Sequence, residues 1–199
     1  MEMPSSFELD KIARDTTESL YYCGLFKEYM ENLNIDDELK RVLAYLGKTD
    51  IPKMLATTPI LDGEKMMEDE LNAYHKTRKD NPSDYQKQTN HLTSVLAYCL
   101  LSENLKIVKS TCEALYIIES RNLEHRKFDL SILAGILEGV GEDSSAIKEE
   151  MKFQPEVYRS LGKRVKDIGE IVKSFLSWYE KRKQKEDELL DNIGRSDKK

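Results

Sequence analysis

The chain has 199 residues, of which 39% are hydrophobic and 34% are charged, and its net charge is −6. This length is sufficient for one domain with its own core, and the high charged fraction favours thin helical layers over a compact sheet core. The longest apolar run, residues 95–101, is far shorter than the roughly 20 residues of a membrane span, so we expect no membrane association.

Leu, Glu and Lys are abundant and β-branched residues are sparse, which predicts an all-α fold. We expect a multi-helix bundle of about seven to eight helices, with a solenoid-like stack as the alternative, since residues 42–45 recur as residues 95–98. From caps, glycines, prolines and apolar periodicity, the expected helices run to about residue 32 and then over about 36–46, 51–56, 64–79, 84–101, 104–120, 127–140 and 155–193.

Three segments follow from these elements. Residues 1–57 form an acidic N-terminal helical segment, residues 64–153 a central helical core, and residues 155–193 a long C-terminal helix. A loop over residues 57–63 is the best candidate for an internal boundary. We expect the three segments to form one compact domain overall.

The three cysteines, Cys23, Cys99 and Cys112, form no C-x-x-C pair, and each lies among apolar neighbours. This arrangement argues against a zinc ribbon or a disulfide scaffold and indicates buried, reduced thiols. The N-terminus also lacks the basic and apolar segments of a secretory signal. We therefore expect a cytoplasmic protein.

The C-terminal helix carries the clearest pattern in the sequence. Its apolar residues follow each other at spacings of 4, 3, 4, 3 and 4, which is a heptad seam made of Leu161, Val165, Ile168, Val172, Phe175 and Tyr179. Such a seam must be covered by another helix, so these six residues are the predicted interface. The sequence leaves open whether the covering helix belongs to the same chain or to another one.

Charge is distributed unevenly along the chain. Residues 1–38 hold three basic and ten acidic side chains, whereas residues 152–185 hold ten basic and four acidic ones. This asymmetry indicates either docking between the two ends or a basic surface for an anionic partner. For the second case, the predicted nucleic-acid-binding residues are Lys163, Arg164, Lys166, Lys181, Arg182, Lys183 and Lys185, the later ones following Trp178 and Tyr179.

Metal and cofactor sites have little support. Glu64 and Glu68 share a helical face and are the weak candidates for a metal such as Mg²⁺, but no matching carboxylate pair or E-x-x-H motif accompanies them. We favour the interpretation that these residues form a solvated helix face. No glycine-rich phosphate loop occurs, and we expect no cofactor.

The hexad from Arg121 to Arg126 distantly resembles the HEPN family of helical RNA-cleaving domains, whose motif is an Arg, often followed by Asn, and a later His. In that family the Arg and His engage the scissile phosphate and the 2′-hydroxyl, so the resemblance implies catalytic roles for Arg121 and His125. Here three residues lie between them, instead of the family's four to six, and the family's following Tyr is missing. A polar turn between two helices, capped by Asn122, is the competing interpretation.

These observations favour a non-enzymatic helical interaction or assembly subunit that associates through its C-terminal helix, with a protein partner or as a homo-oligomer. The alternative is an RNA-processing or nucleic-acid-binding helical module that uses Arg121, His125 and the basic residues 163–185. The lack of catalytic spacing elsewhere inclines the prediction away from an enzyme.

Overall fold

The computed structural model describes residues 6–196. All regular structure in this range is helical, which confirms the predicted all-α multi-helix fold. Within the same range, no helix is long and apolar enough to cross a membrane.

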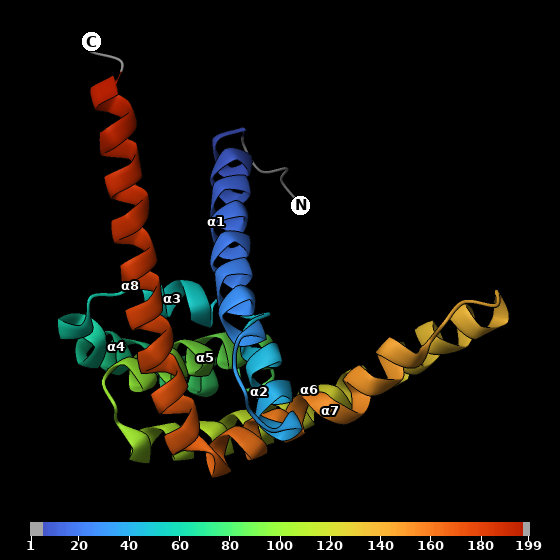
Figure 1. Cartoon of the computed structure of the whole chain (residues 1–199). Helices are drawn as coiled ribbons and strands as arrows, with labels where there is room; N and C mark the ends of the chain where they lie inside the picture. The colour runs from blue at the N-terminus through green and yellow to red at the C-terminus, as the bar shows by residue number, and fades with distance from the viewer. Residues whose placement is uncertain (1–5, 197–199) are drawn as a thin grey trace.

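Helices α2, α5 and α6 begin where a short polar side chain satisfies a free backbone amide. Asp36, Asp84 and Asn104 each accept a hydrogen bond from the backbone N–H three residues later, the usual geometry of an N-cap. The elements are α1 (Ser6–Glu31), α2 (Asp37–Leu46), α3 (Ile51–Thr57), the 3-10 helix η1 (Ile60–Asp62), α4 (Gly63–Asp80), α5 (Tyr85–Leu101), α6 (Leu105–Gly139), α7 (Ser145–Lys163) and α8 (Val165–Ser196) (Figure 1).

Helix α5 lies at the centre of the molecule. It contacts α3, α4, α6 and α8, and every residue from Val95 to Leu101 is buried. The apolar run that is too short for a membrane is therefore the inner helix of the core. This half of α5 is apolar on all sides, so other helices must pack against it on all sides. Helices from both halves of the chain do so.

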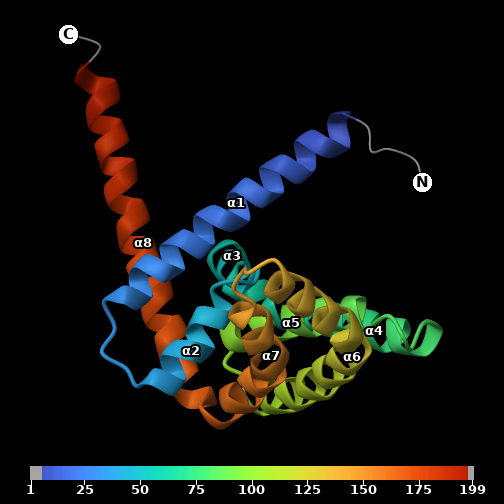
Figure 2. The ribbon, with the colours of Figure 1, turned by 90° about the vertical axis from the view of Figure 1, so that its right-hand side faces the viewer.

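Four long helices extend beyond this core. Helices α6 and α7 pack along each other as a hairpin that projects as an arm to the right of Figure 1. Helices α1 and α8 leave the opposite part of the body, and Figure 2 shows that their outer ends diverge. The fold thus combines a packed centre with long, wetted helical faces, as the composition predicted.

The seam of the C-terminal helix closes the core. Phe175 is fully buried, and its ring packs edge-to-face on Phe26 at 5.0 Å and against Tyr29 at 5.5 Å between ring centroids. Both partners come from α1, so the two ends of the chain meet here. Aromatic pairs at these distances contribute beyond the area that they bury.

The predicted break near Arg121 is wrong, because α6 continues as one helix from Leu105 to Gly139. No Gly or Pro interrupts residues 105–134, and the polar hexad consists largely of good helix formers. Leu123 and Leu130 are half-buried and Ala134 is buried, so an inward stripe also persists through this stretch.

The predicted start of the last helix at Pro155 is also wrong. Pro155 lies inside α7 and is buried, and the chain breaks instead at Arg164, whose backbone N–H donates to the carbonyls of Ser160 and Leu161. A Pro inside a helix removes one hydrogen bond. Packing of α7 along the arm offsets that loss, so the helix continues through Pro155. The break at Arg164 then divides the predicted C-terminal helix between α7 and α8.

Truncating the central ring of the seam should test this core. We expect Phe175→Ala to lower the free energy of unfolding by about 3–5 kcal/mol, since it removes a fully buried aromatic ring and leaves a cavity. Leu190→Ala on the same helix is the matched control, because Leu190 is 66% exposed and should cost less than about 0.5 kcal/mol. Urea unfolding followed by circular dichroism measures both, and equal losses would contradict this description of the seam.

Candidate interaction surfaces

The predicted interface seam is covered within the chain. Its first five residues, from Leu161 to Phe175, are each at most 2% exposed. Tyr179 is half-buried, and its hydroxyl lies 3.4 Å from that of Tyr22 on α1. The covering helices are those of the same core, so the seam leaves little surface for a second protein.

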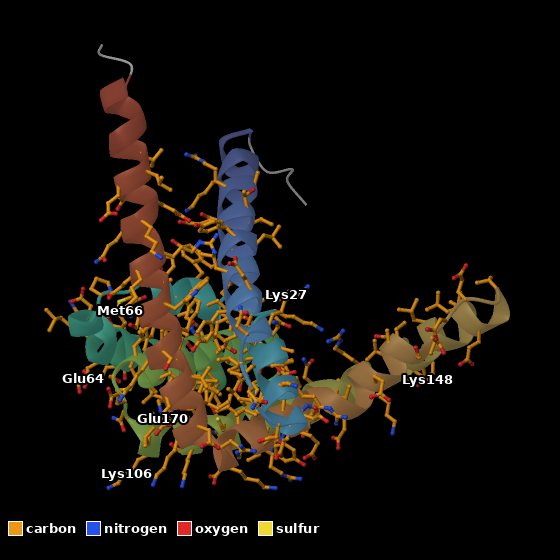
Figure 3. The ribbon with its side chains drawn as sticks, in the orientation of Figure 1. Lys27, Glu64, Met66, Lys106, Lys148 and Glu170 are labelled. Atoms are coloured by element: carbon orange, nitrogen blue, oxygen red, sulfur yellow. The ribbon has the colours of Figure 1, made fainter. Side chains whose placement is uncertain are left out.

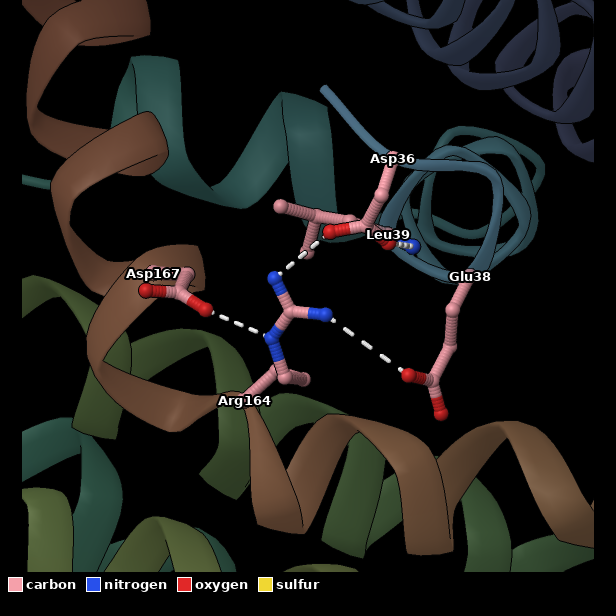
Figure 4. A network of polar contacts seen from close by, with 5 residues as sticks. All are labelled: Asp36, Glu38, Leu39, Arg164 and Asp167. Atoms are coloured by element: carbon pink, nitrogen blue, oxygen red, sulfur yellow. Dashed lines mark hydrogen bonds and ion pairs between the residues drawn. The ribbon is translucent and has the colours of Figure 1, made fainter.

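Charge pairing joins the acidic N-terminal segment to the break between α7 and α8. The Arg164 guanidinium bonds to Asp36 at 2.8 Å and to Asp167 at 2.6 Å, and it lies 3.6 Å from Glu38 (Figure 4). The hydrogen bond from Arg164, together with the backbone N–H of Leu39, lowers the pKa of Asp36 to about 2. We call this break between α7 and α8 the elbow. Arg164, one of the predicted nucleic-acid-binding residues, is therefore engaged in an internal contact there.

The later basic stretch is separate from this elbow. Lys181 follows Lys166 by fifteen residues, which corresponds to about 22 Å along a helix axis. Arg182 pairs with Glu28 on α1 at 2.6 Å and with Glu186 at 3.1 Å, so it too serves the contact between the chain ends. Lys181, Lys183 and Lys185 are exposed. The two basic stretches do not form one continuous strip.

Lys163 and Lys166 remain exposed and lie in a different setting. They line a hollow at the elbow together with two lysines of the first turns of α6, Lys106 and Lys109. The position of Lys106 below α8 is labelled in Figure 3. Sequence reasoning missed the α6 lysines, because nothing local connects them to residues some 57 positions away.

Arg121 and His125 do share one exposed face of α6, as their spacing of four residues predicted. The His125 ring lies 5.3 Å from the ring of Tyr85, between centroids. The part of the chain that the structure describes gives Arg121 no ion pair. The pair is therefore accessible, but it lies on an open helical face and not in a cleft.

The acidic candidates lie apart from any metal-binding group. Glu64 and Glu68 are exposed on the outer side of α4, where Figure 3 labels Glu64. Among the described residues, no three His, Cys, Asp or Glu side chains cluster so as to hold a metal ion. A carboxylate–imidazole contact that sequence reasoning missed joins Glu70 to Nδ1 of His91 at 2.7 Å, across α4 and α5.

Two of the three cysteines are buried, as the sequence predicted, and the third is half-buried. Cys99 and Cys112 are buried, and burial raises the pKa of each thiol to about 12. Cys23 is half-buried and its pKa is also raised by burial. Nucleophilic cysteines need a lowered pKa, so these thiols are unsuited to that chemistry.

An exposed apolar face on the arm was not predicted. Leu133 and Ile136 lie in the predicted central core segment but are exposed, because α7 covers only the opposite side of α6. Phe128 is 73% and Val140 69% exposed. We call this surface the outer α6 face; its residues are Phe128, Ile132, Leu133, Gly135, Ile136, Gly139 and Val140. Side-chain patterning alone could not separate the two sides, since this stretch is apolar around most of the helix.

The contact between Arg164 and Asp36 gives a pH-dependent prediction. The pKa of Asp36 is lower in the folded chain than in the unfolded one, so its contribution to stability is present above about pH 4 and is lost as the pH falls towards 2. In Arg164→Gln the pKa of Asp36 should rise towards 3.8, although the Leu39 amide keeps it lower. A carboxyl ¹³C NMR titration measures this shift.

The control is Arg78→Gln, since Arg78 is exposed on α4 and should leave the titration of Asp36 unchanged. The stability difference between the wild type and Arg164→Gln should shrink as the pH falls from about 4 to 2. An Asp36 titration that is the same with and without Arg164 would contradict the pairing in Figure 4.

Comparison with known proteins adds no assignment to these surfaces. No family model, no curated protein and no solved structure matches the chain. Function therefore has to be inferred from the exposed surfaces, of which two stand out: the outer α6 face and the basic hollow at the elbow.

Proposed function

We propose that the protein is a non-enzymatic helical assembly subunit that pairs with a second copy of itself through the outer α6 face. The exposure of this face is the single observation that supports the proposal. Five large apolar side chains are exposed along about four turns of one helix, at 46–73% of their surface. Contiguous exposed apolar surface of this kind is typical of protein interaction sites.

The face has a shape that suits a copy of itself. Gly135 and Gly139 lie on the same side of α6 as Phe128 and Ile132, and a Cβ added at either glycine would meet nothing within 4 Å. When two such helices run antiparallel about a two-fold axis between Leu133 and Ala134, Phe128 lies opposite Gly139 and Ile132 lies opposite Gly135. Large side chains then fill the space above glycines, in both directions at once.

Charge along α6 favours the same antiparallel orientation. Before Phe128, residues 121–127 contain three basic side chains and one acidic one. Beyond Ile136, residues 138–143 contain three acidic side chains and no basic one. An antiparallel pair places the basic end of each helix beside the acidic end of the other, whereas a parallel pair brings like charges together.

The proposal retains the predicted function of an assembly subunit. It places the interface on the outer α6 face instead of on the seam of the C-terminal helix. The predicted seam is already buried between α7, α8 and the rest of the core, so assembly through it would require unfolding of the chain's own contacts. Helix α7 contributes indirectly, because it supports α6 from behind along the arm.

A cytoplasmic location is part of this proposal, supported by three free cysteines. The alternative, RNA processing by Arg121 and His125, has one supporting observation, namely that both side chains are exposed on the same face. In the antiparallel pair Arg121 would lie beyond the Gly139 end of the second copy's α6, outside the interface.

Light scattering coupled to size-exclusion chromatography tests the pairing. We expect a mass of about twice 23.1 kDa at about 100 µM protein, and a monomer for the double variant Phe128→Asp, Ile136→Asp, because buried unpaired carboxylates oppose association. Leu61→Asp is the matched control; Leu61 is 96% exposed elsewhere on the surface, and this variant should remain dimeric. A monomeric wild type, or a double variant that still dimerises, would refute the proposal.

Cysteine cross-linking tests the orientation separately. Under oxidation, Phe128→Cys combined with Gly139→Cys should form disulfide-linked dimers, since position 128 of one copy lies opposite position 139 of the other. Phe128→Cys alone should not do so, because the two copies of residue 128 are far apart in an antiparallel pair. Efficient linkage of the single variant would indicate parallel pairing and contradict the proposed two-fold arrangement.

A further inference from the structure

A hollow of about 610 Å³ lies between α6 and the last turns of α7, and a second hollow of about 400 Å³ adjoins it where α8 begins. The two are continuous, because Lys109 and Lys163 line both, and we call them together the elbow groove. Their volumes fall within the range of small-molecule sites. Neither hollow includes the outer α6 face, so a ligand in the groove would bind independently of the proposed assembly.

The elbow groove is strongly basic in a chain whose net charge is −6. Six cationic side chains line it against two carboxylates, Glu113 and Asp167, and Asp167 is engaged by Arg164. In the part of the chain that the structure describes, no carboxylate lies within 4.0 Å of the four lysines of the groove. These four are Lys106, Lys109, Lys163 and Lys166.

The positions of these lysines oppose the intrinsic preferences of their helices. Lys106 lies in the first turn of α6 and Lys166 in the first turn of α8, where the helix dipole disfavours positive charge. Lys109 and Lys163 line the same space from two helices and repel each other. The arrangement costs stability in the empty protein, and an anion between these ammonium groups would reverse that cost.

The larger hollow has a different character at its inner end. Tyr116, Ile117 and the buried side of Cys112 provide an apolar wall there. The Arg159 guanidinium carbon lies 3.9 Å from the centroid of the Tyr116 ring, which fixes a planar cation beside an aromatic face. A flat, conjugated ring system fits such a wall, since it can stack on the outer face of the guanidinium that Tyr116 holds.

From this combination we propose that the elbow groove binds a nucleotide, either free or as part of a single strand, with its phosphates among Lys106, Lys109, Lys163 and Lys166 and its base towards Tyr116. Phosphate oxygens accept charge-assisted hydrogen bonds from several ammonium groups at once. The apolar wall would contact the base, whereas the lysines contact only the phosphates and cannot distinguish a nucleotide from inorganic phosphate. A nucleotide unites both parts in one molecule, whereas inorganic phosphate or a nucleoside uses only one of them.

Calorimetric titration of the full chain at about 50 mM salt, with ATP, inorganic triphosphate, adenosine and a twelve-residue oligouridylate, tests the site. We expect ATP to bind about tenfold more tightly than triphosphate, and adenosine to bind more weakly than either. The double variant Lys109→Gln, Lys163→Gln should weaken ATP binding at least about tenfold. Tyr116→Leu should weaken ATP binding and leave triphosphate binding unchanged.

The matched control is Lys65→Gln combined with Lys76→Gln, since both lysines are exposed on α4 and lie outside the groove. ATP binding in this control should equal that of the wild type. Oligouridylate binding that exceeds ATP binding and is lost in the Lys109, Lys163 variant would identify a strand as the source of the nucleotide. The proposal is overturned if neither ATP nor the strand binds, if triphosphate binds as tightly as ATP, or if the groove and control variants behave alike.

Discussion

Burial of one aromatic side chain, Phe175, ties the molecule together. Its ring is enclosed by Phe26 and Tyr29 of α1 and by neighbouring rings of α8, so the first and last long helices are fixed against each other. Because this contact covers the outer side of the core, the second half of α5 can be apolar on all sides. The same contact uses up the apolar seam of the C-terminal region, which is why any assembly surface has to lie elsewhere.

The basic side chains likewise divide into those that pair with carboxylates of the same chain and those that do not. Arg164 and Arg182 neutralise acidic residues of the N-terminal segment, and both form charge-assisted hydrogen bonds to carboxylates. Exposed pairs of this kind contribute little to stability individually, but they fix the orientation of helices that the aromatic contact brings together. The lysines beside Arg164 have no such partner among the described residues. The acidic residues 1–38 therefore neutralise only part of the basic charge of residues 152–185. Basic side chains without an acidic partner remain at the elbow.

Periodicity predicted the elements that depend on local sequence. The apolar residues of the seam from Leu161 to Phe175 are covered as expected, because apolar spacing is a property of neighbouring residues, although Leu161 lies on α7 and the others on α8. The break at Arg164 could not be predicted, since it depends on carboxylates more than a hundred residues away. Pro155 was misleading for a similar reason: its local signal favours a helix start, and tertiary packing along α6 outweighs it. Neither candidate surface has a local sequence signature. The outer α6 face can be recognised only when it is known which side of α6 is covered by α7, and the elbow groove combines residues of α6 with residues near the break between α7 and α8.

The meeting of α1 with α8 also bears on how the chain reaches its native state. The hydroxyls of Tyr22 and Tyr179 lie within 3.4 Å of each other although 157 residues separate them in sequence. Contacts over such a separation slow folding, since most of the chain must be ordered before they form. Helix α3 can cover part of α1 early, whereas the contacts of α1 with α8 form only after the segment between them has been ordered. The contact between α1 and α8 should therefore be among the last parts of the structure to form, after the helices between them have packed on α5.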